Sequence, residues 1–191
     1  MKSTKKKIFL NYNDIEKFAN DLAREILLSD WRPDYIVGIT RGGLLPAVLL
    51  SQYLKVPMNS LDVSLRDGSE LGPESNTWMA EDAFGYVASQ ERDEPKDYSS
   101  AVLRKNILIV DDINDTGETL AWIQHDWSSG CLPASDAWDE IWGKNVRTAV
   151  VVNNESSEWD HVDYFGLEIN KAVNDKWVVF PTEDWWQPKP Q

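Results

Sequence analysis

The sequence has little cysteine and no long apolar segment. Its 191 residues include one cysteine, Cys131, so no disulfide can form within the chain, which fits a reducing cytoplasm. No apolar run approaches the roughly 20 residues that a transmembrane helix requires. The N-terminus also lacks the apolar length of a signal peptide. We therefore expect a cytoplasmic protein without a membrane partner.

The sequence also lacks an excess of basic residues, because its formal net charge is −13 at pH 7. An acidic surface repels a phosphate backbone, so no nucleic-acid partner is expected. The consecutive lysines at 5–7 are interpreted as a solvated tail. Neither internal repeats nor a linker divide the chain, and its length fits one domain, residues 1–191, with a sizeable core.

What the sequence does contain is an apolar strand followed by a turn rich in acids and hydroxyls. Ile107–Val110 are consecutive apolar residues, which is typical of a parallel strand covered on both sides. Asp111 and Asp112 follow directly. Residues 115–119, Asp-Thr-Gly-Glu-Thr, then lead into an amphipathic segment. A turn at a helix start directs several backbone N–H groups towards one point, so this stretch is a candidate phosphate site.

Strand and helix patterns alternate through most of the chain. Apolar residues with helical spacing run from 13 to 28, with Asn13 as candidate N-cap and Glu16 three residues later. The members of this apolar stripe are Ile15, Phe18, Ala19, Leu22, Ala23, Ile26 and Leu27. A second helix is predicted at 44–54, and further strands within 35–39, 55–63, 147–152, 161–167 and 177–181. The alternation predicts an α/β fold, a parallel twisted sheet with helices on both faces.

Ligands bind beyond the carboxyl ends of the strands in such a sheet. Thr40-Arg41-Gly42-Gly43 follows the strand predicted at 35–39. A glycine pair between strand and helix permits a tight turn that faces an anion, and Arg41 supplies a fixed positive charge. We expect this turn, Asp111–Thr119, Asn153 and Trp177 to meet at one edge of the sheet.

The order of these features resembles the phosphoribosyl-pyrophosphate (PRPP) signature of the type I phosphoribosyltransferases. That signature has an apolar strand, two acids, two spacers, an acid and Thr-Gly-x-Thr, which residues 107–119 match. The alternative is an ordinary strand, acidic turn and helix in another α/β protein. The 40–43 turn is similar to the family's pyrophosphate loop, which implies a cis peptide bond between Thr40 and Arg41. The resemblance extends from the first helix to Asp184.

The resemblance implies transfer of the phosphoribosyl group from PRPP to a purine nitrogen, as with hypoxanthine, guanine or xanthine, and release of pyrophosphate. Asp115 and Arg41 are the candidate catalytic residues. Asp115 would accept the proton of the base, although it could instead be an aspartate that only forms the turn. Arg41 would bind the leaving group. The residues expected to bind substrate are Thr40, Gly42, Gly43, Asp111, Asp112, Thr116, Gly117, Glu118, Thr119, Asn153, Trp177 and Val178. Mg²⁺ is the implied cofactor, with Asp111, Asp112 and Asp184 as candidate ligands.

The residues that would read the nucleobase follow the pattern less closely. Trp177 and Val178 resemble the positions that stack on the purine and read its edge through a backbone carbonyl, although Trp177 could instead be structural. Members of the family carry a lysine at the end of the penultimate strand for the 6-oxo group, where this chain has Asn153 and Asn154. An amide can donate or accept, so the choice of base stays open. Lys171 or Lys176 could substitute for the missing lysine.

Two segments match the family least. Residues 64–105 are mostly polar, with a short apolar segment among them. The resemblance implies that they form a flexible lid over the site. Arg66 and Arg92 either contact pyrophosphate from this lid or are solvated loop residues. Residues 125–144 form a long insert, which Trp127, Trp138 and Trp142 are expected to anchor. His125 and Cys131 without a second pair of ligands do not predict a metal site. The residues from about 168 to 191 are expected to form a small hood.

Three functions are compatible with the sequence. The first is a purine phosphoribosyltransferase of nucleotide salvage, which the resemblance implies to be a dimer or tetramer. The second is a phosphoribosyltransferase for another acceptor, such as a pyrimidine. The third is a regulatory protein that binds PRPP without catalysis. The presence of Asp115 argues against this function, because a protein that only binds PRPP would not need it.

Overall fold

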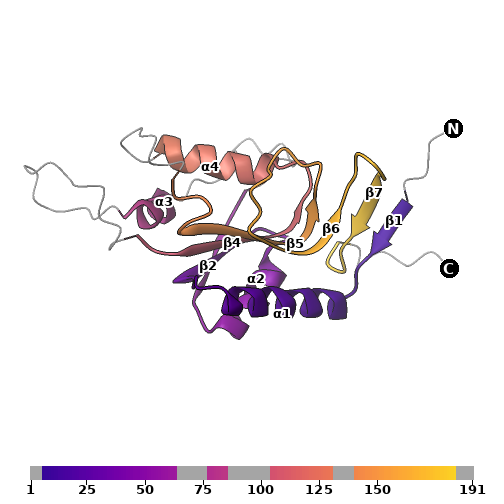
Figure 1. Ribbon diagram of the computed structural model, residues 1–191, viewed down its shortest axis with the longest axis horizontal. Helices are drawn as coiled ribbons and strands as arrows, with labels where there is room; N and C mark the ends of the chain where they lie inside the picture. The colour runs from indigo at the N-terminus through magenta and orange to yellow at the C-terminus, as the bar shows by residue number, and fades with distance from the viewer. Residues whose placement is uncertain (1–5, 64–76, 86–103, 131–139, 184–191) are drawn as a thin grey trace, which may run out of the picture.

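The computed structural model describes residues 6–63, 77–85, 104–130 and 140–183, and its centre is a parallel sheet (Figure 1). Five strands form this sheet in the order β3-β2-β4-β5-β6, and every neighbouring pair is parallel. Their bounds are Tyr35–Ile39 (β2), Met58–Leu61 (β3), Ile107–Asn114 (β4), Val146–Asn154 (β5) and Tyr164–Ile169 (β6). The apolar strand that precedes the acid pair is therefore the central one, with both edges paired.

Helices cover both faces of the sheet, which confirms the predicted fold class. The helices α1 (Tyr12–Leu28) and α2 (Leu44–Leu54) lie on one face, and α3 (Thr77–Phe84) and α4 (Glu118–Gly130) lie on the other (Figure 1). Alternate residues of β4 supply the two cores: Leu108 and Val110 pack with α1 and α2, whereas Ile107 and Ile109 pack with α3 and α4. Within the described ranges, none of the helices has the length and apolarity needed to cross a bilayer.

The first helix begins earlier than predicted. Asn11, not Asn13, is its N-cap, because the Asn11 side chain accepts from the backbone N–H groups of Asn13 and Asp14 at 2.9 and 3.1 Å. Asp14 completes the capping box by accepting from the Asn11 N–H at 2.8 Å. Glu16 has no part in it. Leu27 was also misassigned to the buried stripe, since 49% of it is exposed.

Residues near the two termini of the described chain form a second, smaller sheet. Its strands β1 (Lys6–Phe9) and β7 (Lys176–Val179) pair in parallel, with Lys7 opposite Trp177. Lys6 and Lys7 are therefore part of a strand, and their interpretation as a tail was wrong. Val178 and Phe180 pack with Ile15 of α1 and with β5, so this sheet is fixed to the end of the larger one. It occupies the place expected of the hood.

Two elements run further than their sequence patterns indicate. β4 continues through the acids to Asn114, because it pairs with β5 as far as the Asn114–Asn153 register. α4 continues to Gly130 and so includes the first part of the predicted insert at 125–144. Residues 131–139 of that insert, with Cys131 and Trp138, lie outside the described residues, as do most of the 64–105 segment, Arg66, Arg92 and Asp184.

Candidate functional site

Two loops meet at the carboxyl end of the central strands. The first is Thr40–Gly43, between β2 and α2, and it contains the expected cis peptide bond between Thr40 and Arg41. The second runs from Asp111 to Thr119 and consists of the end of β4, the turn at 115–117 and the first two residues of α4. Because β2 and β4 are neighbours in the sheet, the two loops lie side by side.

The glycine pair allows this close approach. A Cβ on Gly42 would overlap the carboxylate of Asp112, and a Cβ on Gly43 would overlap the backbone oxygen of Val110 and lie 2.9 Å from the Asp111 Cα. A side chain at Gly43 would force the loops apart, because it would meet backbone, whereas one at Gly42 would displace the Asp112 carboxylate. The first loop is thus held against the acid pair, while the Arg41 side chain is exposed and the Thr40 hydroxyl donates to Asp62 Oδ1 at 2.7 Å.

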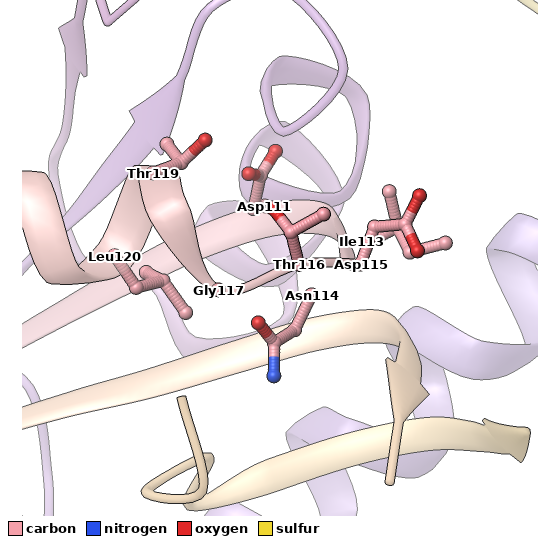
Figure 2. Close-up of a pocket in the computed structure, with 8 residues that line it drawn as sticks. All are labelled: Asp111, Ile113, Asn114, Asp115, Thr116, Gly117, Thr119 and Leu120. Atoms are coloured by element: carbon pink, nitrogen blue, oxygen red, sulfur yellow. The ribbon is translucent and has the colours of Figure 1, made fainter. Parts of the chain in front are cut away.

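A polar pocket opens where the second loop enters α4 (Figure 2). The residues that line it are Asp111, Ile113, Asn114, Asp115, Thr116, Gly117, Thr119 and Leu120. It faces the N-terminus of α4, where backbone N–H groups have no partner within the helix and the helix dipole is positive. Thr116 is exposed and Thr119 partly so, and the Thr116 hydroxyl oxygen accepts from the Glu118 N–H at 3.4 Å. The arrangement therefore suits a phosphate.

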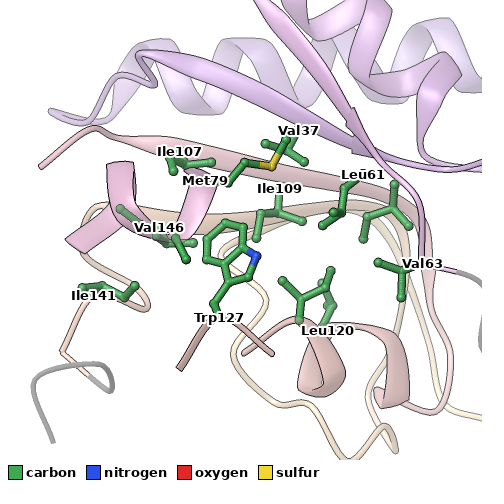
Figure 3. Close-up of a cluster of buried hydrophobic side chains, with 14 of the residues drawn as sticks. Val37, Leu61, Val63, Met79, Ile107, Ile109, Leu120, Trp127, Ile141 and Val146 are labelled. Atoms are coloured by element: carbon green, nitrogen blue, oxygen red, sulfur yellow. The ribbon is translucent and has the colours of Figure 1, made fainter. Parts of the chain in front are cut away.

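The helix behind this pocket is anchored by a tryptophan. Trp127, one of the expected anchors, is 1% exposed and points from α4 towards Ile109 and Val146 of the sheet (Figure 3). Its ring lies 5.8 Å from that of Trp142, which in turn lies 5.5 Å from that of Trp159. This aromatic packing fixes α4 relative to the strands, and so fixes the loop at its N-terminus.

The candidate phosphate site at residues 115–119, called the phosphate loop from here on, is also supported from the side. Gly117 has a φ of +93°, and a Cβ there would lie 2.5 Å from the backbone nitrogen of Trp159. The Glu158 N–H donates to the Thr116 carbonyl at 3.0 Å. The phosphate loop therefore depends on a glycine at 117 for both its conformation and its packing.

Asn114 supports the phosphate loop from below, and sequence reasoning missed it. It is 2% exposed, and its amide donates to Asn153 Oδ1 and to the Trp159 carbonyl, both at 2.9 Å. Its own oxygen accepts from the Ser157 hydroxyl at 2.9 Å. In Figure 2 its side chain points to the opposite side of the loop from Asp111. A polar residue at a buried strand position was the available signal, but it was treated as a spacer.

The asparagines at the end of β5 have partners within the protein. Asn154 is 5% exposed, and its amide donates to the Asp115 carbonyl at 2.8 Å. Its oxygen accepts from the Ser156 hydroxyl at 2.8 Å and from the Lys171 N–H at 3.0 Å. Asn153 is partly buried, and its oxygen accepts from Asn114. Asn154 therefore holds the backbone around the site rather than facing a ligand.

Lys171 comes to the site from the connection between β6 and β7. Its Nζ lies 2.6 Å from Asp115 Oδ1, and the two side chains are 16% and 22% exposed. The same Nζ lies 5.8 Å from the centre of the Trp177 ring, within the range of a cation–π contact. Trp177 itself is 44% exposed on β7, whereas its neighbour Val178 is buried. Lys171 thus links the hood tryptophan to the phosphate loop.

The described residues contain no cluster of three or more potential metal ligands, and His125 is exposed on α4. Asp111 and Asp112 are adjacent, and the Asp112 N–H donates to Asp111 Oδ1 at 2.8 Å. One or two carboxylates suffice for Mg²⁺, which keeps several waters and takes further oxygens from a phosphorylated substrate. The donor set therefore fits a metal that arrives with its substrate.

Comparison with known proteins agrees with this geometry. A family model described as "Phosphoribosyl transferase domain" matches residues 7–184. The chain belongs to this family. The matched range includes both loops and β7, so this phosphoribosyltransferase has the fold and the activity class that its signature predicted.

Individual relatives of the phosphoribosyltransferase act on purines, according to their names. It is 25% identical to xanthine phosphoribosyltransferase 1 of Saccharomyces cerevisiae over 92% of this chain and 88% of that protein. It is 27% identical to the hypoxanthine-guanine phosphoribosyltransferase of Schizosaccharomyces pombe over 93% and 89%. Among solved structures, a purine phosphoribosyltransferase from Pyrococcus horikoshii aligns with a TM-score of 0.59 at 25% identity, covering 97% of both chains.

Proposed function

We propose that this protein transfers the phosphoribosyl group of PRPP to a 6-oxopurine, as a salvage enzyme of the hypoxanthine, guanine or xanthine type. The observation that carries the proposal is the meeting of the Thr40–Gly43 loop with the acid pair beside the phosphate loop. The names of the relatives support the purine acceptor. Its cytoplasmic location and its assembly as a dimer or tetramer stay predictions.

The proposed chemistry starts with the sugar phosphate. Backbone N–H groups of residues 116–119 and the hydroxyls of Thr116 and Thr119 would bind the 5′-phosphate, as helix N-termini bind anions. Asp111 and Asp112 would accept from the ribose hydroxyls. Fixing both ends of the ribose holds the carbon under attack at one position, which is worth several kcal/mol in a displacement reaction.

Departure of pyrophosphate is the second part of the reaction. The C1–O bond of the ribose breaks as the C1–N bond to the base forms, and the electron pair leaves with pyrophosphate. Arg41 and the N–H groups of Gly42 and Gly43 would bind the leaving group. Mg²⁺, held by Asp111 and Asp112, would supply the charge that neutralises it. Asp184, the third candidate ligand, lies outside the described residues.

Asp115 would accept the proton of the attacking base. Its backbone is fixed by Asn154, so the carboxylate has a defined position at the rim of the pocket. A general base must lie within hydrogen-bond reach of the proton it removes, and such a base contributes about 10²–10⁴-fold to rate.

The assay is incubation of the protein with PRPP, Mg²⁺ and a panel of purines and pyrimidines, while released pyrophosphate and nucleoside monophosphate are measured. We expect turnover with at least one 6-oxopurine and its loss when EDTA removes the metal. Turnover with pyrimidines alone would identify another acceptor. Tight PRPP binding without turnover on any base would identify a regulatory protein.

Trp177 is proposed to stack on the purine, since it is a large exposed aromatic beside Lys171. We expect Trp177→Ala to raise the KM for the base about 5- to 150-fold, because base–aromatic stacking is worth about 1–3 kcal/mol. The KM for PRPP should change little. Trp78→Ala is the matched control, since Trp78 is 43% exposed but belongs to α3 and stacks on Tyr35. An unchanged KM for the base would mean that Trp177 is a packing residue.

A further inference from the structure

Lys171 brings a positive charge to the point where the base must bind if the proposed function holds. Its ammonium lies between the carboxylate of Asp115, at 2.6 Å, and the ring of Trp177, at 5.8 Å. These are the groups proposed above to take the proton of the base and to stack on its ring. A cation in contact with both is adjacent to the edge of any bound purine.

The other polar groups nearby are poorly suited to read that edge. Asn154 is buried, its amide donates to Asp115 and its oxygen accepts from Ser156 and Lys171. The oxygen of Asn153 accepts from Asn114. Even with a free amide, an asparagine can present either a donor or an acceptor and would not discriminate between an oxo and an amino group.

The backbone of Lys171 is held in place by the turn that follows β5. The Lys171 N–H donates to Asn154 Oδ1 at 3.0 Å, and the next residue, Ala172, donates to the Ser156 hydroxyl at 3.2 Å. The Glu155 N–H donates to the Ile169 carbonyl at 2.8 Å. Asn154, the last residue of β5, and the turn after it therefore dock the β6–β7 connection, and the docked connection carries the lysine.

We propose that Lys171 donates a hydrogen bond to the 6-oxo group of the purine and so determines the choice of base. This inference rests on the proposed function, because it assigns a residue to the same site. An ammonium has three N–H donors and no acceptor. One donor is directed at Asp115, which leaves others for the oxo group of hypoxanthine, guanine or xanthine. A 6-amino group would present its own N–H to the cation and be rejected.

The test compares two bases that differ in the 6-oxo group, hypoxanthine and unsubstituted purine, in wild type and Lys171→Met. We expect wild type to prefer hypoxanthine in kcat/KM, and the variant to lose about 10- to 100-fold of that preference, the effect of a hydrogen bond from a charged donor. The KM for PRPP should stay within about twofold, because Lys171 is proposed to contact the base and not PRPP.

Lys176→Met is the matched control, since Lys176 lies five residues further on, in β7, opposite Lys6. We expect it to keep the preference of wild type. Lys171→Arg retains N–H donors and should keep part of the preference. If Lys171→Met does not fold, Lys171→Gln gives the same comparison, because a neutral amide also lacks the selective donor.

Each result distinguishes the two proposals. A wild type that transfers to neither base, nor to any other purine, would refute the proposed function and this inference with it. A wild type active on hypoxanthine whose preference survives in Lys171→Met would overturn this inference alone. So would equal losses on both bases with a raised KM for PRPP, because a merely structural lysine would act in that way.

Discussion

Asp115→Asn should lower kcat about 10²–10⁴-fold, the range expected for loss of a general base. The KM for PRPP should change by no more than a few fold. The amide keeps the size of the side chain, and the Asp115 carbonyl still accepts from Asn154, so the loop keeps its backbone. What is lost is the proton acceptor and the charge that pairs with Lys171. Steady-state kinetics with PRPP and base varied separately would measure both quantities.

The control for this variant is Asp160→Asn, which removes an exposed acid that pairs with His161 away from the pocket. We expect Asp160→Asn to have the same kcat and the same KM for PRPP as wild type. Equal losses in kcat and in PRPP affinity for Asp115→Asn would contradict a role in proton transfer, and would indicate that Asp115 serves to hold the phosphate loop.

Gly117→Ala should lower kcat/KM for PRPP about 100-fold, which is the effect of displacing a substrate by about 1 Å. A φ of +93° costs a side-chain-bearing residue roughly 1–2 kcal/mol. The added Cβ would in addition lie 2.5 Å from the Trp159 nitrogen and 2.8 Å from the Ser157 hydroxyl oxygen. The loop must therefore move, and its N–H groups would no longer converge on the phosphate.

Gly143→Ala separates these two effects. Gly143 also has a positive φ, +71°, but the nearest atom to an added Cβ is Asp163 Oδ1 at 4.0 Å. We expect this variant to lower the unfolding temperature by the backbone cost alone and to keep its activity. If Gly117→Ala bound PRPP as wild type does, the phosphate would not be held by the loop conformation described here.

The sequence was sufficient for the fold because the fold depends on local patterns. A short uninterrupted apolar run such as Ile107–Val110 is typical of a strand that is buried on both faces. The glycines at 42 and 43 were recognised as a turn, and the structure adds the reason for them, which is the carboxylate of Asp112 and the backbone of β4.

The parts that sequence reasoning missed depend on contacts between residues far apart in the chain. Lys171 was named as a possible substitute for the missing lysine, but its ion pair with Asp115, 56 residues away, was not predicted, because no local pattern marks that lysine as a partner of the acid. The pairing of β1 with β7 joins residues even further apart, so Lys6 and Lys7 resembled a tail. The cap at Asn11 was missed for a simpler reason, since Asn11 and Asn13 both precede the apolar stripe.

A crystal structure with inosine monophosphate would test the central claim most directly. We expect the phosphate on the backbone N–H groups of residues 116–119, the ribose hydroxyls on Asp111 and Asp112, and the 6-oxo group on the Lys171 ammonium. A nucleotide bound elsewhere, with no phosphate at the N-terminus of α4, would contradict the account.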